Sequence, residues 1–327
     1  VLAALTPSRP DAVLAMSPPL PIGLAGLAVA KLRRAPFVFN IQDVFPDVAV
    51  ELGLLTNRHV IRVARAAERF IYRHADAVTV LSDDLHDNVA AKIGEQRGRH
   101  RTRVEVIPNF VDTKAVQPSE RENAYRREHD LIGRTVVMYA GNVGFSQSLE
   151  LLLDAARTLR DERPDLVFVI NGGGAARPSL EQAAREQGLT NVRFVDYQPI
   201  ERLPAVLAAA DIHVVPLKRG LARASVPSKL YSVLAAGRPV LASIDPGTEV
   251  ANTLAKADAG VSVPPEDPAA FVAALCAMLD DRARTEQMGR NGRKFVESWV
   301  SPAAVASAYA RLFAQLAGRV PPAPVRP

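Results

Sequence analysis

The sequence predicts an α/β protein built from two Rossmann-like, doubly wound domains, the first of them incomplete. Three observations support this prediction. Short apolar runs alternate with longer amphipathic runs along the chain, which is typical of βα units and parallel sheets. A polar, turn-rich stretch at residues 108–122 separates two such series. A length of 327 residues is enough for two domains of ordinary size.

The first series holds fewer βα units than the second. Its expected strands are 12–15, 37–41, 77–81 and 104–107, and its expected helices are 19–32, 58–74 and 84–93. Ser82 or Asp83 is expected to cap the last of these helices, because a short polar side chain accepts a hydrogen bond from an unpaired N–H at a helix start. We expect one or two further strands to precede this series.

The second series is more regular. Its expected strands are 136–139, 166–170, 192–195, 212–216, 240–243 and 260–263, with helices between them and a last one at 268–279. Such a sheet binds its ligands beyond the carboxyl ends of the strands. The predicted domains are 1–112 and 113–281. Helices within 282–319 are expected to pack back on the first domain, and the proline-rich residues 320–327 to be disordered.

Composition is typical of a soluble globular protein, with 48 % hydrophobic and 23 % charged residues. Cys276 is the single cysteine, so no internal disulfide can form, and a reducing, cytoplasmic compartment is expected. The longest apolar run, residues 20–30, is about half as long as a bilayer-spanning helix. We therefore expect it to form a packed helix.

The net charge of +5 is patterned along the chain. Arginines spaced four, three, four and four residues apart form one stripe on the expected helix 58–74: Arg58, Arg62, Arg65, Arg69 and Arg73. This helix either presents a solvated arginine face or lies on an anionic membrane surface. A second basic group occupies an expected loop: Arg97, Arg99, His100, Arg101 and Arg103. Neither group interleaves aromatic residues, so nucleic acid is not an expected partner.

Residues 224–243 predict a phosphate site. They combine a loop, a helix opened by Pro227, a turn at Gly237 and a buried strand. Lys229 falls in the first helical turn, where backbone N–H groups are unpaired and the helix dipole is positive. A diphosphate needs several convergent donors. The candidate donors in and before this helix are Arg219, Arg223, Ser225, Ser228 and Lys229.

Other loops at the same edge of the expected sheet carry further candidates for donor binding: Gly141, Asn142, Gly144, Gly173 and Tyr197. Glycines allow a backbone to approach a ligand closely, and an aromatic ring can stack on a nucleobase. Ser146 is expected to cap the helix after the first loop. Glu249, behind Thr248 as an expected cap, either anchors sugar hydroxyls or complements a helix dipole. The alternative to ligand binding by the glycine loops is that they only form tight turns between a strand and a helix.

The segments with the greatest resemblance to a known family lie in both domains. In the first domain they are PDAVLAMSPPL, NIQDVFPD, VTVLSDDL and VEVIPNFVD. In the second they are YAGNVGFSQSLELLLDAA, FVINGGG, VRFVDYQPIERLPAVLAAADIHVVPL, PSKLYSVLAAGRPVLA and GTEVAN. In this order and spacing, from Pro10 to Phe313, they resemble the family 4 (group 1) glycosyltransferases of GT-B fold, including bacterial colanic-acid and exopolysaccharide members.

The resemblance implies that the second domain binds a nucleotide-diphospho-sugar, that the first binds most of the acceptor, and that the sugar crosses the cleft with retention of its configuration. By the same analogy we expect a hexosyl or N-acetylhexosaminyl donor and a lipid-linked glycan acceptor in cell-envelope synthesis. The arginine stripe is then a peripheral contact with the inner face of the cytoplasmic membrane. No cofactor and no metal site is expected, because Asp-x-Asp does not occur at a strand end.

Two departures from the family pattern affect the expected roles. The family often carries two glutamates eight positions apart around this helix, where this chain has Ala224 and Ser232. Ser232 is expected to keep one hydrogen bond and Glu249 to compensate. Relatives also bind the diphosphate with an Arg and a Lys in the first loop of this domain, and GNVGFSQS has neither. Lys229 with Arg223 is expected to supply that charge, helped by backbone N–H groups at 141–144 and 228–230.

Asp43 and Lys229 are the expected catalytic residues. Asp43 is expected to act in catalysis or to orient the acceptor. Relatives often have His-Asp where this chain has Gln42-Asp43, and the alternative is that Asp43 caps the turn ahead of Pro46. Two other functions stay open. One is a nucleotide-sugar epimerase of similar fold, for which we find no acid–base constellation. The other is a non-catalytic nucleotide-sugar-binding or assembly protein, which the missing glutamates favour.

Overall fold

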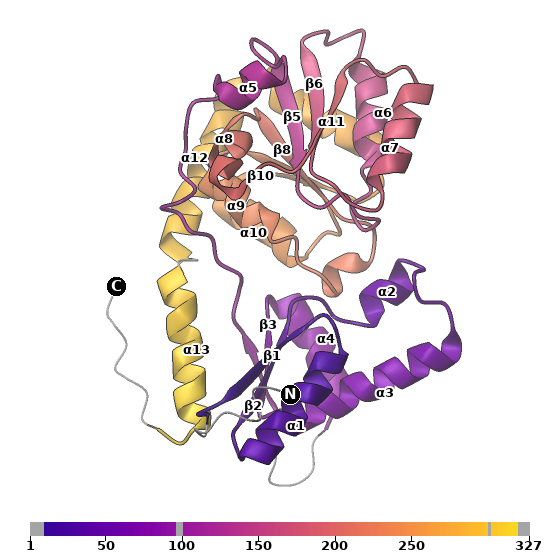
Figure 1. Cartoon of the computed structure of the whole chain (residues 1–327). Coiled ribbons are helices and arrows are strands. Elements are labelled where there is room, and N and C mark those ends of the chain that lie inside the picture. The colour runs from indigo at the N-terminus through magenta and orange to yellow at the C-terminus, as the bar shows by residue number, and fades with distance from the viewer. Residues whose placement is uncertain (1–9, 96–100, 300–301, 320–327) are drawn as a thin grey trace. The chain divides into compact units, whose positions relative to one another are not determined.

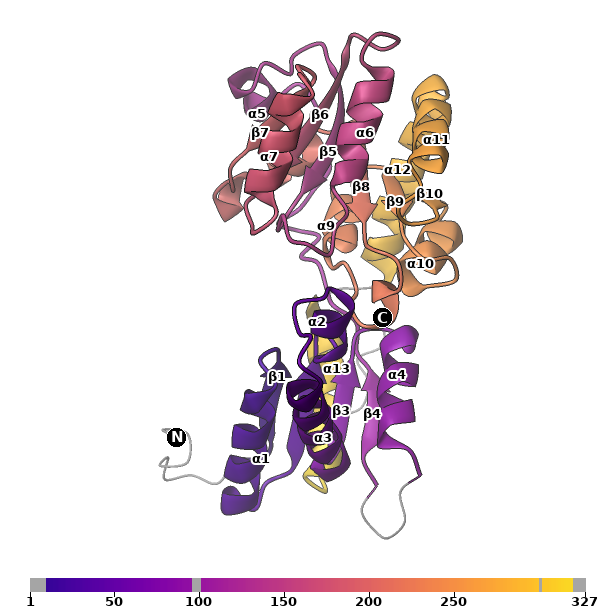
Figure 2. The same cartoon turned by 90° about the vertical axis from the view of Figure 1, so that its right-hand side faces the viewer.

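The computed structural model describes residues 10–95, 101–299 and 302–319. They form two parallel sheets of four and six strands, both flanked by helices, which confirms the predicted fold class (Figures 1 and 2). The chain divides into two compact units. The first unit runs to Asn109 and also includes Arg223–Val226 and the last helix, whereas the second comprises Phe110–Ala222 and continues from Pro227.

The first sheet has the strand order β1-β2-β3-β4 and is parallel throughout. Its strands are β1 (Val13–Ser17), β2 (Phe37–Ile41), β3 (Ala77–Val80) and β4 (Arg103–Val106). The helices of this unit are α1 (Pro21–Arg33), α2 (Asp47–Glu51), α3 (Arg58–His74), α4 (Asp83–Ile93) and α13 (Pro302–Leu316). The boundaries of β2 and α3 agree with the predicted ones.

Successive residues of β2 face two different cores, because side chains alternate along a strand. Phe37, Phe39 and Ile41 pack with residues of α1, α3 and α4. Val38 points the other way and packs with residues of α13. This double burial explains why the strand is apolar except for Asn40, whose buried amide donates to Thr79 and Tyr309. Of the two predicted caps of α4, Ser82 is the one used, since its Oγ accepts a hydrogen bond from the backbone N–H of Leu85 at 3.3 Å.

A buried charge cluster joins α2, α3 and α4. Glu68 is 1 % exposed. Lys92 Nζ lies 2.6 Å from a carboxylate oxygen of Glu68 and 2.7 Å from one of Asp47. Desolvation raises the pKa of Glu68, and the charge of Lys92 opposes that shift. One lysine on α4 therefore holds carboxylates from the two preceding helices, including the arginine-rich α3.

The second sheet has the order β10-β9-β8-β5-β6-β7 and is also parallel. Its strands are β5 (Thr135–Ala140), β6 (Leu166–Asn171), β7 (Val192–Val195), β8 (Ile212–Pro216), β9 (Val240–Ser243) and β10 (Gly260–Val263). The strand order reverses between β5 and β8. In doubly wound sheets, ligands bind at such a switch point, outside the carboxyl ends of the strands.

Helices flank both faces of the second sheet. One core contains residues of α6 (Glu150–Leu159), α7 (Arg177–Glu186) and α11 (Pro268–Asp280), and the other contains residues of α5 (Ala124–Glu128) and α8 (Leu203–Ala208). Helices α9 (Lys229–Ala235) and α10 (Glu249–Ala257) follow β8 and β9. Two 3₁₀ turns, η2 (Ile200–Arg202) and η3 (Leu221–Arg223), complete the unit together with α12 (Arg282–Trp299).

The two C-terminal helices belong to different units. Helix α13 packs on the first sheet through Val305 and Leu312. Helix α12 belongs to the second unit. Its glycines allow a close approach, because a Cβ at Gly289 would lie 2.3 Å from the carbonyl oxygen of Gly237, and one at Gly292 would lie 2.7 Å from Leu234. The expectation that both helices pack on the first domain is therefore wrong for α12.

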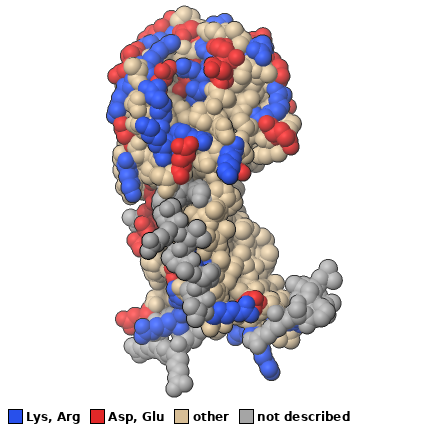
Figure 3. Space-filling model, turned by 90° about the vertical axis from the view of Figure 1, so that its left-hand side faces the viewer, with Lys and Arg blue, Asp and Glu red and all other residues tan. Residues whose placement is uncertain are grey.

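Within the described ranges, no helix has both the length and the apolarity to cross a membrane. Charges of both signs are interspersed over the face of the second unit seen in Figure 3. Arg97, Arg99 and His100 of the second basic group, and the tail 320–327, lie outside the described residues. Arg103 of that group hydrogen-bonds Glu105 at 2.7 Å.

Replacing Lys92 by methionine tests the buried charge cluster. We expect the free energy of unfolding to fall by about 3–5 kcal/mol at pH 7, because Glu68 loses its partner. Lowering the pH to 5 should recover part of the loss, since a carboxyl whose pKa is raised by folding favours the folded state when it is protonated. Urea denaturation at both pH values measures this. Adding Glu68→Gln should abolish the pH difference, and an equal loss at both pH values would contradict this account.

Candidate functional site

The candidate site lies where the loops after β5 and β6 meet. Gly172 has a φ of +142°, and a Cβ at this residue would lie 1.9 Å from the carbonyl oxygen of Gly141. A Cβ at Gly174 would lie 2.3 Å from the carbonyl oxygen of Val143. The backbone N–H of Val143 donates a hydrogen bond to the carbonyl of Gly173 at 2.8 Å. Only glycine allows two backbones to approach this closely. Gly172 and Gly174 are therefore required by packing of the two loops.

Lys229 reaches the same loops from α9. Its Nζ lies 3.3 Å from the position that a Cβ at Gly141 would take. The same atom lies 3.8 Å from the centre of the Tyr139 ring and donates a hydrogen bond to the Tyr139 hydroxyl. Although the residue as a whole is only partly buried, desolvation of the amine lowers the pKa of Lys229 to about 7. The structure thus brings Lys229 and Gly141 together at the switch point of the sheet.

Two further predicted residues surround these loops. The carbonyl oxygen of Asn142 accepts a hydrogen bond from the Tyr139 hydroxyl. Tyr197 is 58 % exposed, and a carbon of its ring lies 3.4 Å from the Cβ position at Gly173. An exposed aromatic ring beside a glycine loop offers a flat apolar face to a ligand. Gly141, Asn142, Gly173, Tyr197 and Lys229 are therefore gathered at one edge of the second unit.

The backbone N–H groups expected to face a phosphate are already engaged. Those of Gly141 and Val143 donate to carbonyls of the neighbouring loop, and that of Gly144 donates to a glutamine side chain at 2.9 Å. In α9, the N–H of Leu230 donates to a carbonyl of the preceding turn. The expectation that N–H groups at 141–144 and 228–230 face a phosphate is therefore wrong for these four groups. Their hydrogen bonds are already accepted by the paired loops, by the Gln147 side chain and by the turn before α9. Among the described residues, two cations lie at this edge: Arg177, which is paired with Glu181 and Asp196, and Lys229, which forms no ion pair.

The expected cluster of donors around Lys229 does not form within the second unit. Arg219 donates to a backbone carbonyl after β10 at 2.8 Å. Ser225 belongs to the first unit, where it forms an antiparallel bridge with Asp43. The side chain of Arg223 lies outside the described part of the structure. Residues Arg223–Val226 of this connection belong to the first unit, where Ala224 is buried in the core.

Asp43 is half-buried in the first unit. Helix α2 begins after it, with Pro46 in the N-cap position and no side-chain cap hydrogen bond. The alternative prediction, in which Asp43 caps this turn, is therefore wrong. The backbone beside Asp43 pairs instead with the segment that includes Ser225, since Val44 donates its N–H to the carbonyl of Ala224 at 2.8 Å.

The remaining predicted residues lie on α9 and α10. Ser228 occupies the N-cap position of α9 without a side-chain cap hydrogen bond, and Ser232 lies within that helix. Glu249 opens α10 and accepts a hydrogen bond from the Thr253 hydroxyl at 3.2 Å. Burial, with the charge of Glu249 as a further cause, raises the pKa of Tyr231 on α9. Glu249 therefore lies near α9 and is partly held by its own helix.

Two predicted helix caps differ from the structure. Ser146 does not cap α6, because that helix begins at Glu150 with Leu149 in the N-cap position. Thr248 does occupy the N-cap position of α10, but its hydroxyl donates to the carbonyl of Asp245 at 2.6 Å instead of accepting from the helix.

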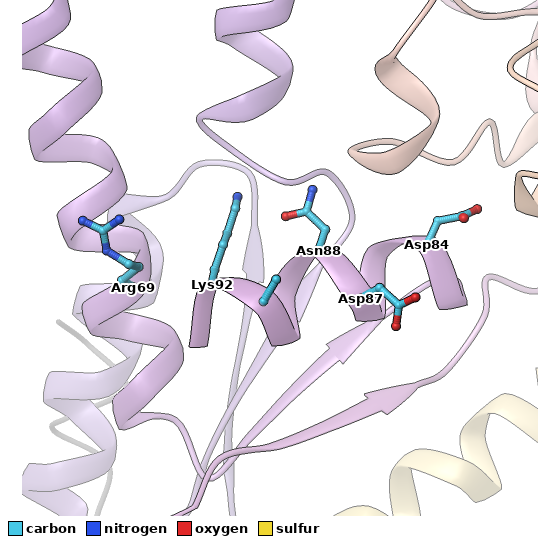
Figure 4. A pocket seen from close by; sticks show the side chains of 6 residues that line it. Arg69, Asp84, Asp87, Asn88 and Lys92 are labelled. Carbon is cyan, nitrogen blue, oxygen red and sulfur yellow. The ribbon is translucent and has the colours of Figure 1, made fainter. Parts of the chain in front are cut away.

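A hollow in the first unit lies between α3 and α4 and has a volume of about 670 Å³. Its lining residues are Arg69, Asp84, Asp87, Asn88, Ala91 and Lys92. Asn88 and Lys92 point to the same side of α4, and Arg69 comes from α3 (Figure 4). Asp47 and Glu68 already neutralise Lys92, and Asp84 and Asp87 line the same hollow beside Arg69, so the hollow carries charges of both signs.

Sequence reasoning missed Tyr139. This residue is fully buried at the end of β5 and contacts both Lys229 and the backbone of Asn142. A signal was present, because a phenol that ends a buried strand directly before a glycine loop needs a partner for its hydroxyl. The identity of that partner depends on contacts between distant parts of the chain.

Solved structures show that this architecture is the GT-B fold. Sucrose-phosphate synthase from Thermosynechococcus elongatus has a TM-score of 0.76 at 21 % identity, covering 94 % of this chain and 73 % of that one. HepE from Anabaena, in complex with UDP and glucose, has a TM-score of 0.75 at 15 % identity, covering 92 % and 77 %.

The chain belongs to the group 1, or family 4, glycosyltransferases. The family described as "Glycosyl transferases group 1" matches residues 134–281, and the "Glycosyl transferase 4-like domain" matches residues 1–109. The putative colanic acid biosynthesis glycosyl transferase WcaI of Escherichia coli is 32 % identical over 275 residues, which are 82 % of this chain and 66 % of the relative. The probable glycosyltransferase WbjE of Pseudomonas aeruginosa is 30 % identical over 247 residues, or 75 % and 59 %. The chain thus spans less than two thirds of these relatives.

Substituting Gly172 by alanine tests the close packing of the two loops. We expect a loss of at least about 2 kcal/mol in the free energy of unfolding, because the new Cβ overlaps a backbone oxygen and the φ is unfavourable. Gly133→Ala is the control, since its φ of +71° is also unfavourable but its surroundings are open. Thermal denaturation compares the two variants. Equal losses would show that the loops separate easily.

Proposed function

We propose that this chain is a nucleotide-sugar-dependent glycosyltransferase of cell-envelope or exopolysaccharide synthesis. It transfers a hexosyl or N-acetylhexosaminyl group, with retention, to a lipid-linked glycan. The observation that carries the proposal is the amine of Lys229 against Gly141 at the switch point of the second sheet. Family membership supports the reaction class, and WcaI, a relative named for colanic acid biosynthesis, supports the kind of product.

The second unit supplies the donor chemistry in this proposal. When the bond between the anomeric carbon and the diphosphate oxygen breaks, its electron pair and negative charge go to the diphosphate. A protonated Lys229 stabilises that charge in a partly desolvated position, where a fixed cation acts more strongly than in water. Tyr197 stacks on the nucleobase beside Gly173, and Ser232 and Glu249 hydrogen-bond hydroxyls of the ribose or the sugar.

The first unit supplies the acceptor side. Asp43 orients the acceptor hydroxyl, whose oxygen forms the new bond to the anomeric carbon while its proton passes to the departing diphosphate oxygen. Arg223, Ser225 and Ser228 belong to the chain that leads from β8 into α9, and we assign them to the donor. The reaction as proposed needs no metal ion or cofactor, because the lysine carries the compensating charge.

Helix α3 supports a peripheral membrane contact on the cytoplasmic side. All five arginines of its stripe are exposed: Arg58, Arg62, Arg65, Arg69 and Arg73. Val60, Val63 and Phe70 are also exposed, by 49 %, 69 % and 47 %. A helix with exposed cations and apolar side chains binds at the interface of anionic lipid. The predicted solvated arginine face does not explain the exposed apolar residues.

Binding of nucleoside diphosphates tests the donor site. In a thermal-shift screen of UDP, GDP and ADP, we expect at least one to raise the melting temperature, because a ligand of the folded state stabilises it. Lys229→Met should weaken that nucleotide about tenfold to a hundredfold, since a hydrogen bond to a charged group is lost. Calorimetry gives the affinities, and Lys256→Met on α10 is the control. Unchanged affinity in Lys229→Met would remove Lys229 from the site.

Incubation with a sugar nucleotide separates the proposed reaction from the alternatives. A glycosyltransferase releases the nucleoside diphosphate when a glycan-lipid acceptor is added, and the release is followed by chromatography. An epimerase changes the sugar of the donor without an acceptor. A protein that binds the nucleotide but leaves the donor unchanged in both conditions would be the non-catalytic alternative.

Vesicle binding tests the membrane contact. Replacing Arg58, Arg62 and Arg69 by glutamine should weaken binding to vesicles containing phosphatidylserine about a hundredfold, at about 1 kcal/mol for each arginine. The control replaces three exposed arginines of the second unit, Arg157, Arg160 and Arg185. Sedimentation with the vesicles gives the bound fraction. The same binding in both variants would exclude α3 as the contact.

A further inference from the structure

Tyr139 determines where the Lys229 amine lies. The phenol ends β5 and is completely buried at the switch point of the second sheet. Lys229 Nζ lies 3.8 Å from the centre of its ring and donates to its hydroxyl. The face of an aromatic ring attracts a cation, and a hydroxyl adds a directional bond. The amine therefore has two contacts with a single rigid side chain.

The hydroxyl of Tyr139 also ties this amine to the glycine loop. A phenol has one proton to donate, and Tyr139 gives it to the carbonyl oxygen of Asn142. Its lone pairs then accept from Lys229. Burial raises the pKa of Tyr139, so this hydroxyl remains protonated at neutral pH. A continuous chain of hydrogen bonds thus joins the Lys229 amine to the backbone of the loop after β5.

The surroundings leave the charge of Lys229 without a fixed counterion. Burial is the only cause that shifts its pKa, and no carboxylate of the described residues forms an ion pair with it. Neither loop, 141–144 or 172–174, carries a charged side chain. Among the described residues, a charged Lys229 therefore lacks an anionic partner, and a diphosphate would supply one.

Among the described residues, Arg177 of α7 donates to the carbonyl of Gly172 at 2.7 Å and is paired with Glu181 and Asp196. The titratable groups beside the amine itself are phenols. The amine lies over the ring of Tyr139. The charge of Tyr197, from the loop after β7, contributes to the raised pKa of Tyr139. Tyr231 shares the helix α9 with Lys229, and burial raises its pKa as well. The charge of Glu249 on α10 contributes to the raised pKa of Tyr231. It does not contribute to the lowered pKa of Lys229, which desolvation causes. Near neutral pH, the group in this set that changes its charge is Lys229.

We propose that Tyr139 is a positioning residue for donor binding: its ring and hydroxyl hold the Lys229 amine at the glycine loop, ready to take up a proton as the diphosphate binds. This inference rests on the proposed function, because it assumes that the diphosphate of the donor lies at Lys229. It adds a residue outside the expected site and a coupling between donor affinity and pH.

The coupling has a definite sign. In the free protein the pKa of Lys229 is about 7. A bound diphosphate favours the charged amine and raises this pKa, so binding above pH 7 must take up a proton. Affinity should therefore fall as the pH rises, by up to about tenfold per unit between pH 7.5 and 9. Removing the Tyr139 hydroxyl takes an acceptor away from the charged amine, which moves the fall in affinity to lower pH.

Titration calorimetry with UDP, and with GDP in parallel, tests the inference between pH 6.5 and 9. Buffers of different ionisation enthalpy give the number of protons taken up. We expect about 0.9 proton at pH 8 for the natural chain and none for Lys229→Met. Tyr139→Phe should bind about fivefold more weakly at pH 7, with its pH profile displaced to lower pH.

Tyr125→Phe is the matched control. It removes another buried phenol hydroxyl of the same unit, one that donates to Asn171 Oδ1 at 2.8 Å, without touching Lys229. This variant should lose stability but keep the affinity and the pH profile. Binding of UDP or GDP by Tyr139→Phe with unchanged affinity and unchanged profile would overturn the inference and leave the proposed function standing. If the natural chain binds neither nucleotide, both the proposed function and this inference fail.

A second measurement covers the case in which Tyr139→Phe does not fold. In the natural chain, ¹³C labels at Lys Cε and Tyr Cζ report the two groups separately by NMR, with Lys229→Met and Tyr125→Phe used for assignment. The Tyr139 signal should follow pH with the same midpoint as the Lys229 signal, and both should shift when UDP is added. Independent midpoints for the two signals would overturn the inference.

Discussion

The contact between the Lys229 amine and the buried Tyr139 ring is the interaction on which the candidate donor site depends. An amine without a carboxylate partner is costly to keep charged away from water, and desolvation lowers its pKa to about 7. The ring and hydroxyl hold the amine without neutralising it. Lys92 in the first unit shows the contrasting arrangement, because two carboxylates hold it and its charge serves the packing of three helices.

The glycine loops impose a second constraint on the same site. Gly172 lets the loop after β6 approach the carbonyl of Gly141, and the two loops then pair through their backbones. This pairing uses the N–H groups that a phosphate would otherwise contact. In the proposed function, the diphosphate is therefore held by a side-chain cation more than by a helix start, since α9 has seven residues and its first turn is already hydrogen-bonded.

Departures from the family pattern acquire a physical meaning in this arrangement. Ala224 stands where relatives often carry a glutamate, and it is buried with residues of the first unit, where a carboxylate would be costly. Ser232 stands in place of the second glutamate on α9. Without these two acids, the proposed donor site has two fewer carboxylates near Lys229 than the family pattern gives.

The sequence alone determined most of the elements, because hydrophobic periodicity reports burial directly. It predicted the boundaries of β2, α3, β7, β8, β9 and β10 and the position of Lys229 at a helix start. It did not reveal Tyr139, the engaged N–H groups, or the assignment of α12 to the second unit. Tyr139 and Lys229 are 90 positions apart, and their contact follows from the reversal of strand order between β5 and β8. Only the tertiary structure decides such contacts, because local periodicity carries no information about which distant strands become neighbours.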